Sequence, residues 1–397
     1  MLESYRHRLA MWLAVKPERW ENWRWQQRHS IRSLDSLLTT YPGLDGGSIH
    51  AAQNWATRGF RLRLTPYMLS LMEHDHNALP RRDDPVWRQF FPPFLSARPA
   101  HDEYRADNEN WEKPEEMLTP ILQRKYPDRA IVCATETCFG YCTFCFRSLQ
   151  STHPGERHGG LRHWARTLRV LADNPDIEEV ILSGGEPLIL ADDRLETLLR
   201  DLRGIRSVRT IRIHTRAGTH NPYRFGTELG RLLKRYDVTA MCLHVQHAHE
   251  LTKDLAEALD KLRDAHPRLM LLSQTVLMKG VNDDSTTLGQ LFVRLYRLGI
   301  KPYYLFHMMP NIPAADATRT SVVRGAVIMD TLRRKMTSPA LPEYVLSSMD
   351  GKRAVPHGLE GTPEFRYETD DEGKPIIRFR NWQDRWVEYP DVPDPDL

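Results

Sequence analysis

Residues 130–148 read AIVCATETCFGYCTFCFRS, a short apolar run that leads directly into three closely spaced cysteines. Such a short run, bounded by a change in composition, is typical of a buried strand. A helix-like segment follows this run and each of the further apolar runs given below. One of these segments has leucines at the spacing of a single buried helix face, at Leu195, Leu198, Leu199 and Leu202. Five further apolar runs occupy residues 179–185, 210–216, 239–245, 269–277 and 302–306.

Strands that alternate with helices predict a parallel sheet built from βα units. Six such units predict an α/β fold, a partial (β/α)6 barrel similar to a TIM barrel, rather than a small doubly wound sheet. We expect residues 1–115 to form a helical N-terminal arm and residues 116–338 to form the barrel. Residues 339–397 are expected to form a small C-terminal extension.

The composition argues against several classes of partner. The chain of 397 residues carries 55 Lys plus Arg and 52 Asp plus Glu, so its formal net charge is only +3. This balance predicts no binding to nucleic acid or to an anionic membrane surface, and no apolar run approaches the roughly 20 residues of a membrane span. Five cysteines do not make a disulfide framework, and no export signal is recognisable. We therefore expect a cytoplasmic protein.

Unusual residues recur where the predicted strands end. The sequence SGGEP (183–187) ends the second strand, Thr215 and Arg216 end the third, His244 ends the fourth, and Gln274 lies late in the fifth. In parallel barrels the carboxyl ends of the strands carry the residues that act on substrate. The pattern therefore predicts one functional site at this rim.

Cys138, Cys142 and Cys145 have the spacing C-x3-C-x2-C. Thiolates bind iron–sulfur clusters or zinc, and closed sites of both kinds usually take four protein ligands. Three thiolates on a [4Fe–4S] cluster leave one iron open to a small molecule. A zinc site and a chance grouping are the alternatives. Cys133 is a conceivable fourth ligand, but it lies within the apolar run, where we expect a small buried hydrophobe.

The cysteine spacing, with an aromatic residue before the last cysteine, resembles the motif of the radical S-adenosylmethionine superfamily. The resemblance implies a [4Fe–4S] cluster whose open iron chelates S-adenosylmethionine. An electron from a donor of the flavodoxin or ferredoxin type then releases a 5′-deoxyadenosyl radical. Gly184, Gly185 and Glu186 match the superfamily's glycine-rich motif, which receives the methionine ammonium, and glycine there lets the backbone approach closely.

Longer stretches resemble the lysine 2,3-aminomutase family over about residues 20–355. The resemblance implies an isomerase that uses pyridoxal phosphate (PLP) beside S-adenosylmethionine, an amino-acid 2,3-aminomutase. Its small-molecule substrate forms an imine with PLP, the radical removes a hydrogen from Cβ, and the nitrogen migrates from Cα to Cβ. The matching stretches include WENWRWQQR (20–28), YPDR (126–129), EEVILSGGEPL (178–188) and HVQHAHELT (244–252).

The resemblance also implies roles for individual residues. Arg147 would grip the substrate carboxylate with its planar guanidinium. Lys352 would be the Schiff-base lysine, although only Gly351 precedes it where the family has a run of glycines; Lys279 is a poorer candidate. The residues that would contact S-adenosylmethionine are Thr215, Arg216 and His244, and those near the PLP phosphate are Lys125, Arg129 and Gln274.

Two departures from the family concern the substrate. Lysine-specific members hold the distal ammonium with two aspartates, and Met309 and Ser347 fall near those positions. A buried ammonium without a carboxylate is costly, so we expect a neutral, apolar or small side chain rather than lysine.

The alternatives to an aminomutase are a different radical reaction of an amino acid, small molecule or peptide, and a non-catalytic iron–sulfur or zinc protein. The C-terminal tail lacks cysteine, so the family's zinc should be missing, and a homo-oligomer contact would differ.

Overall fold

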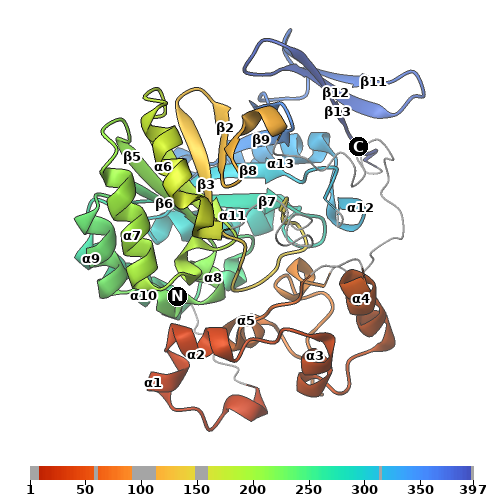
Figure 1. The fold of residues 1–397 in the computed structure, drawn as a ribbon. Coiled ribbons are helices and arrows are strands. Elements are labelled where there is room, and N and C mark those ends of the chain that lie inside the picture. Colours follow the sequence, from red (N-terminus) through yellow and green to blue (C-terminus); the bar gives the residue numbers. More distant parts are fainter. Residues whose placement is uncertain (1–8, 58–60, 92–112, 148–159, 313–314, 395–397) are drawn as a thin grey trace.

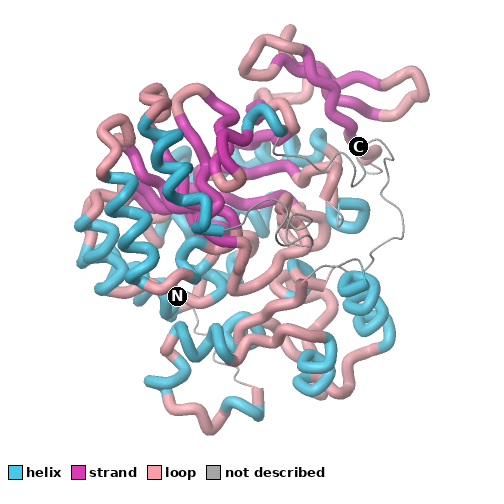
Figure 2. The backbone as a smooth tube through the Cα atoms, viewed as in Figure 1, coloured by secondary structure: helices cyan, strands magenta, loops and turns pink. Residues whose placement is uncertain are grey.

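The structure is a computed structural model that describes residues 9–57, 61–91, 113–147, 160–312 and 315–394 (Figure 1). It is a mixed α/β fold with one large sheet, helices against that sheet, a helical N-terminal region and a small separate sheet near the C-terminus (Figure 2). None of the described helices is long and apolar enough to cross a lipid bilayer.

The main sheet has ten strands whose spatial order follows the chain. Its central seven strands are parallel, and antiparallel strands border them at both edges. The six predicted strands are confirmed as β3 to β8, and the structure adds β9 as a seventh parallel strand. The parallel strands are β3 (Arg129–Thr135), β4 (Glu179–Gly184), β5 (Thr210–Thr215), β6 (Ala240–His244), β7 (Met270–Leu277), β8 (Lys301–His307) and β9 (Glu343–Ser348). The antiparallel edges are β1 (Met117–Thr119) and β2 (Leu122–Tyr126) on one side and β10 (Gly351–Ala354) on the other.

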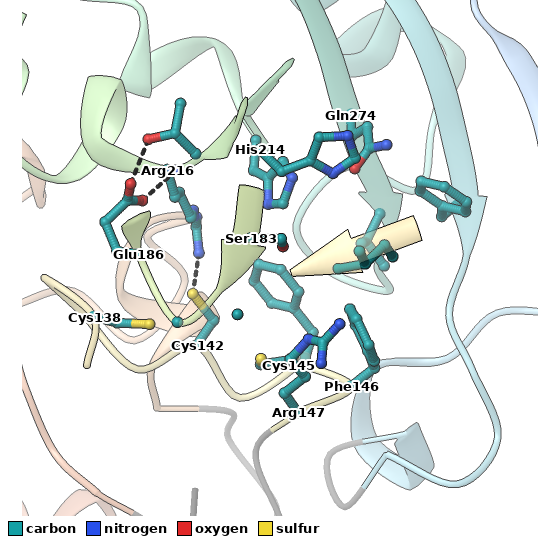
Figure 3. Close-up of a pocket in the computed structure, with 18 of the residues that line it drawn as sticks. Cys138, Cys142, Cys145, Phe146, Arg147, Ser183, Glu186, His214, Arg216 and Gln274 are labelled. Atoms are coloured by element: carbon teal, nitrogen blue, oxygen red, sulfur yellow. Dashed lines mark hydrogen bonds between the residues drawn. The ribbon is translucent and has the colours of Figure 1, made fainter. Parts of the chain in front are cut away.

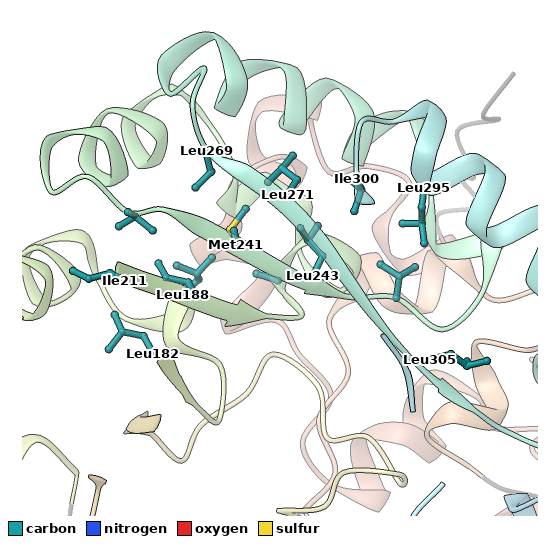
Figure 4. Close-up of a cluster of buried hydrophobic side chains, with 14 of the residues drawn as sticks. Leu182, Leu188, Ile211, Met241, Leu243, Leu269, Leu271, Leu295, Ile300 and Leu305 are labelled. Carbon is teal, nitrogen blue, oxygen red and sulfur yellow. The ribbon is translucent and has the colours of Figure 1, made fainter. Parts of the chain in front are cut away.

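Helices cover the outer face of this sheet and bury the apolar residues that alternate along its strands. On β5, Ile211 and Ile213 are fully buried, whereas Arg212 and His214 alternate with them and line the cavity on the opposite face. Figure 4 shows part of the layer between strands and helices. The helices are α6 (Trp164–Ala172), α7 (Asp192–Arg203), α9 (Thr227–Arg235), α10 (Lys253–Ala265), α11 (Ser285–Arg297) and α13 (Val322–Lys335). The predicted buried face of α7 is confirmed for Leu195, Leu198, Leu199 and Leu202.

The N-terminal region forms a second core rich in aromatic side chains and contacts the barrel where its strands end. Asn22, Ser33 and Thr65 cap three of its helices through their side chains. Thr65 Oγ1 also donates to the carbonyl of His220, 2.6 Å away, beyond β5. The helices are α1 (Pro17–Trp20), α2 (Trp23–Arg28), α3 (Leu34–Thr40), α4 (Gly46–Thr57) and α5 (Pro66–Leu71).

A three-stranded antiparallel sheet near the C-terminus lies beside the main sheet (Figure 2). It is tied to the barrel through Asp391, whose carboxylate accepts from the backbone of Val322 at 3.0 Å. Tyr389 adds a hydrogen bond to the carbonyl of Met308. Its strands are β11 (Phe365–Thr369), β12 (Pro375–Arg380) and β13 (Trp386–Pro390).

The two ends of the main sheet approach each other but share no strand pairing among the described residues. Side chains bridge the gap, which we call the seam. The Tyr126 hydroxyl on β2 accepts from the backbone N–H of Lys352 on β10 at 2.9 Å, and Lys125 Nζ donates to the carbonyl of Met349 at 2.7 Å. The Trp382 ring packs on Tyr126 with centroids 5.6 Å apart. The sheet is therefore a partial barrel whose open side is joined by side chains.

Replacing Tyr126 by phenylalanine should weaken this seam. The change leaves the Lys352 N–H without its acceptor, so we expect the free energy of unfolding to fall by about 1 to 3 kcal/mol. Urea unfolding would measure the loss. Tyr296→Phe is the matched control, because the Tyr296 side chain is 45% exposed; equal stability of the two variants would contradict a structural role for the seam.

Candidate functional site

The concave side of the partial barrel encloses a cavity of about 360 Å³ at the carboxyl ends of the strands. All the residues expected to bind the cluster, the cofactors or the substrate line this one cavity, whereas the poorer candidate Lys279 is exposed and is not among the described lining residues. The set comprises Cys138, Cys142, Cys145, Arg147, Gly184, Gly185, Glu186, Thr215, Arg216, His244, Gln274, Lys125, Arg129 and Lys352. Met309 and Ser347 line it as well. The structure therefore brings together residues that lie more than 200 positions apart.

The three cysteines lie in the loop after β3, and Figure 3 shows their sulfur atoms on one side of the cavity. None of them forms a disulfide, and burial raises the pKa of all three thiols, that of Cys142 to about 11. Cys133 lines the same cavity, but its sulfur accepts from Arg147 Nη1 at 3.2 Å. Three half-buried thiols that line one cavity are a donor set that fits an iron–sulfur cluster held at three corners.

The end of β4 packs directly against the cysteine loop. A Cβ on Gly185 would lie 2.6 Å from the Thr137 carbonyl oxygen, and one on Gly184 would lie 2.7 Å from the Thr135 carbonyl oxygen. Gly184 also has a φ of +105°, a conformation that favours glycine. The N–H of Glu186 donates to the Thr137 carbonyl at 2.8 Å. This contact therefore needs glycine at both positions.

The Glu186 carboxylate joins β4 to the end of β5. It accepts from Thr215 Oγ1 at 2.7 Å and from the backbone N–H of Arg216 at 2.6 Å. A third donor is the N–H of Leu188 at 3.0 Å. Burial raises the pKa of Glu186 to about 6, although these hydrogen bonds oppose the rise. Both carboxylate oxygens thus have protein partners, and Glu186 fixes the rim.

Arg216 and His244 line the cavity beyond the ends of β5 and β6. Arg216 Nη1 donates to the Cys142 sulfur (Figure 3), and Nη2 donates to Glu250 Oε1 at 2.8 Å. Burial, with Arg216 adding to it, lowers the pKa of His244 to about 4, and a hydrogen bond between His244 and Gln274 partly opposes this. His244 is therefore a neutral imidazole at neutral pH, able to donate or accept one hydrogen bond.

Lys352 lines the same cavity from edge strand β10. Burial first, and then the cations Arg129 and Arg212, lower the pKa of its ammonium to about 8. Its Nζ lies 4.5 Å from the centre of the Tyr304 ring. A lysine with such a pKa is partly neutral near pH 8 and can act as a nucleophile.

The two other basic residues expected near a phosphate have protein partners. Lys125 Nζ lies 2.7 Å from Glu116 Oε1, so a carboxylate already offsets its charge. Arg129 Nη1 donates to Asp128 at 2.7 Å, and its guanidinium lies 4.1 Å from the centre of the Tyr126 ring. Both side chains reach the cavity, where each still presents positive charge.

The sequence interpretation missed several cavity residues. Arg212 and His214 lie on β5 and Phe306 lies on β8. The alternation of TIRIHTR offered the signal, because every second residue of a strand faces the same side. The pKa of His214 is well below its usual value, owing to burial and to the neighbouring His244 and Arg212.

Comparison with known proteins agrees with this geometry. A family model described as the radical SAM superfamily matches residues 132–288. A putative L-lysine 2,3-aminomutase of Aquifex aeolicus (strain VF5) is 32% identical over 341 residues, which are 85% of this chain and 88% of that protein. The glutamate 2,3-aminomutase of Clostridioides difficile (strain 630) is 28% identical over 96% of this chain and 85% of its own length. The L-lysine 2,3-aminomutase of Clostridium subterminale is 29% identical over 88% and 80%.

These relatives cover most of both chains, and the matched region includes the three cysteines, SGGE and Arg216. Enzymes of this kind are isomerases that depend on a [4Fe–4S] cluster and S-adenosylmethionine, and lysine 2,3-aminomutases also use PLP. The chain belongs to the lysine 2,3-aminomutase family of the radical S-adenosylmethionine superfamily.

Proposed function

We propose that this protein is a PLP-dependent amino-acid 2,3-aminomutase that converts an α-amino acid with a neutral side chain into the β-amino acid. The observation that carries the proposal is the location of Lys352. A half-buried lysine with a pKa of about 8 lines the same cavity as the three half-buried cysteines. A protein that only held a metal cluster would have no use for such a lysine.

The cavity residues fit the three cofactors of the family. The three thiols suit a cluster with one open iron, and neutral His244 and the glycine backbone of β4 lie beside them. Lys352, Arg129 and Lys125 suit an aldehyde that carries a phosphate. When bound, the cluster and S-adenosylmethionine supply the adenosyl radical, and PLP supplies a π system that can hold an unpaired electron.

Lys352 is prepared for covalent attachment by its surroundings. Burial and the charges of Arg129 and Arg212 favour the neutral amine, which is the form that attacks a carbonyl. The Tyr126 hydroxyl holds the backbone of Lys352 in place at the seam. Strand pairing of Lys352 with Ser347 of β9 fixes its other side.

Arg147 is suited to the substrate carboxylate. It is buried at the end of the cysteine loop, and its guanidinium lies 4.7 Å from the centre of the Phe146 ring. A planar guanidinium at the cavity wall can bind a carboxylate through two parallel hydrogen bonds. In this role Arg147 would orient the amino acid between the cysteine wall and Lys352.

The part of the cavity near Met309 supports a neutral substrate side chain. Met309 packs against an apolar cluster that includes Met308 and Ile312. Glu136 and Glu186 are the only carboxylates among the described lining residues, and the protein's own donors occupy Glu186. The apolar cluster beside Met309 offers neither a carboxylate to a distal ammonium nor a cation to a distal carboxylate.

The attachment of PLP to Lys352 can be tested directly. After anaerobic reconstitution with PLP, borohydride reduction and peptide mass spectrometry should find the cofactor on Lys352. Lys352→Ala should lose the tag, whereas Lys279→Ala, at an exposed position, should keep it. The rate of attachment should rise about tenfold between pH 7 and pH 9, because the neutral fraction of a group with a pKa of about 8 grows by that factor. A tag on Lys279, or a midpoint above pH 10, would contradict the assignment.

Substrate class can be tested with a panel of neutral, acidic and basic amino acids. We expect a neutral amino acid to give β-amino acid at least about tenfold faster than lysine or glutamate, because a buried unpaired charge costs more than 1.4 kcal/mol. Chiral chromatography with mass detection would measure the products. Met309→Asp should raise the relative rate with lysine. The proposal fails if lysine is the best substrate of the unaltered protein.

A further inference from the structure

We propose that Glu250 and Gln89 are positioning residues that hold the Arg216 guanidinium against the sulfur of Cys142, and that this contact raises the reduction potential of the cluster. The inference rests on the part of the proposed function that places a cluster on Cys138, Cys142 and Cys145. It does not depend on the substrate or on PLP.

Arg216 contacts all three partners at once. Its Nη1 donates to Cys142 Sγ, as Figure 3 shows, and its Nη2 donates both to Gln89 Oε1 and to Glu250 Oε1, the latter at 2.8 Å. The Arg216 side chain is 8% exposed and that of Glu250 is 2% exposed. The rings of Phe90 and Phe144 also lie close to the guanidinium, with centres 5.7 and 4.9 Å away. These contacts leave Arg216 little room to turn.

Glu250 is itself held rigidly. It ends a short 3-10 helix, η10 (Ala248–Glu250), just beyond β6. While Oε1 accepts from Arg216, Oε2 accepts from the backbone N–H groups of Gln246 at 2.6 Å and His247 at 2.9 Å. The carboxylate therefore cannot rotate away from Arg216 without leaving buried donors unsatisfied.

Gln89 brings the N-terminal region to the cysteine loop. It ends another 3-10 helix, η2 (Trp87–Gln89), and its side chain is fully buried. Its Nε2 donates to the carbonyl of Pro85 at 2.9 Å, which leaves Oε1 directed at Arg216. Its own carbonyl accepts from the N–H of Thr143 at 3.0 Å and from Thr143 Oγ1 at 2.9 Å. Thr143 directly follows Cys142, so Gln89 fixes both the arginine and the loop that carries the sulfur.

A hydrogen bond to a ligand sulfur changes the energy of the reduced cluster more than that of the oxidised cluster. Reduction adds negative charge that is shared with the sulfur ligands, and an N–H donor on a cation stabilises that charge. The effect is large in a buried, weakly polarisable setting. Losing the contact should therefore make the reduction potential more negative.

The test is a potentiometric titration of the reconstituted cluster, followed by electron paramagnetic resonance, without S-adenosylmethionine. Gln89→Met removes one anchor of Arg216 without changing any charge, and we expect a more negative midpoint potential than that of the unaltered protein. Gln26→Met is the matched control, because Gln26 is equally buried in the same region but its side chain bonds only Trp20 and Tyr67 among the described hydrogen bonds. The control should titrate like the unaltered protein.

Glu250→Gln separates positioning from simple charge. Removing an anion near the cluster would by itself make the midpoint more positive, whereas loosening Arg216 makes it more negative. We expect a negative shift when Arg216 is present. Added to Arg216→Met, Gln89→Met should cause no further shift, and Glu250→Gln should cause only the positive shift that follows from losing the anion. A positive shift for Glu250→Gln, or potentials unchanged in both variants, overturns the inference. Iron and sulfide analysis of the unaltered protein distinguishes this failure from that of the proposed function, which fails only if no cluster forms on the three cysteines.

Discussion

The contact between the end of β4 and the cysteine loop organises the whole site. Gly184 and Gly185 let two backbones meet at a distance that any Cβ would prevent. Glu186 then extends the contact to β5 through Thr215 and the N–H of Arg216. The ends of three neighbouring strands are thereby fixed to one another. Without this packing, the cysteines, the glycine motif and Arg216 would not be held in fixed positions relative to one another.

Several basic side chains line the cavity, and they differ in whether a carboxylate lies beside them. Carboxylates offset four of them: Glu116 lies against Lys125, Asp128 against Arg129, Glu179 against Arg212 and Glu250 against Arg216. These side chains stay charged and can act as fixed anchors for anions. Lys352 instead faces arginines within the protein, and its burial favours the neutral amine. One cavity can thus hold a carboxylate, a phosphate and a nucleophilic amine.

The sequence predicted the parts of the structure that follow from local periodicity. The six apolar runs became β3 to β8, and residues at their carboxyl ends converged because parallel strands end at the same edge. Gln89 and Glu250 left no such signal, because their contacts with Arg216 depend on how segments distant in the sequence pack. The location of Lys352 at a seam closed by Tyr126 likewise follows only from the curvature of the sheet.

Different contacts hold the cysteine loop and Lys352 in place. The N-terminal region and the strand-end loops hold the cysteine loop through Gln89 and Glu250. The pairing of β9 with β10, together with Tyr126, holds Lys352. The described hydrogen bonds of Gln89 and Glu250 reach neither Tyr126 nor Lys352, so a change in one support need not alter the other. The fold can therefore keep the residues around the cysteines constant while other lining residues, such as Met309, decide which amino acid fits.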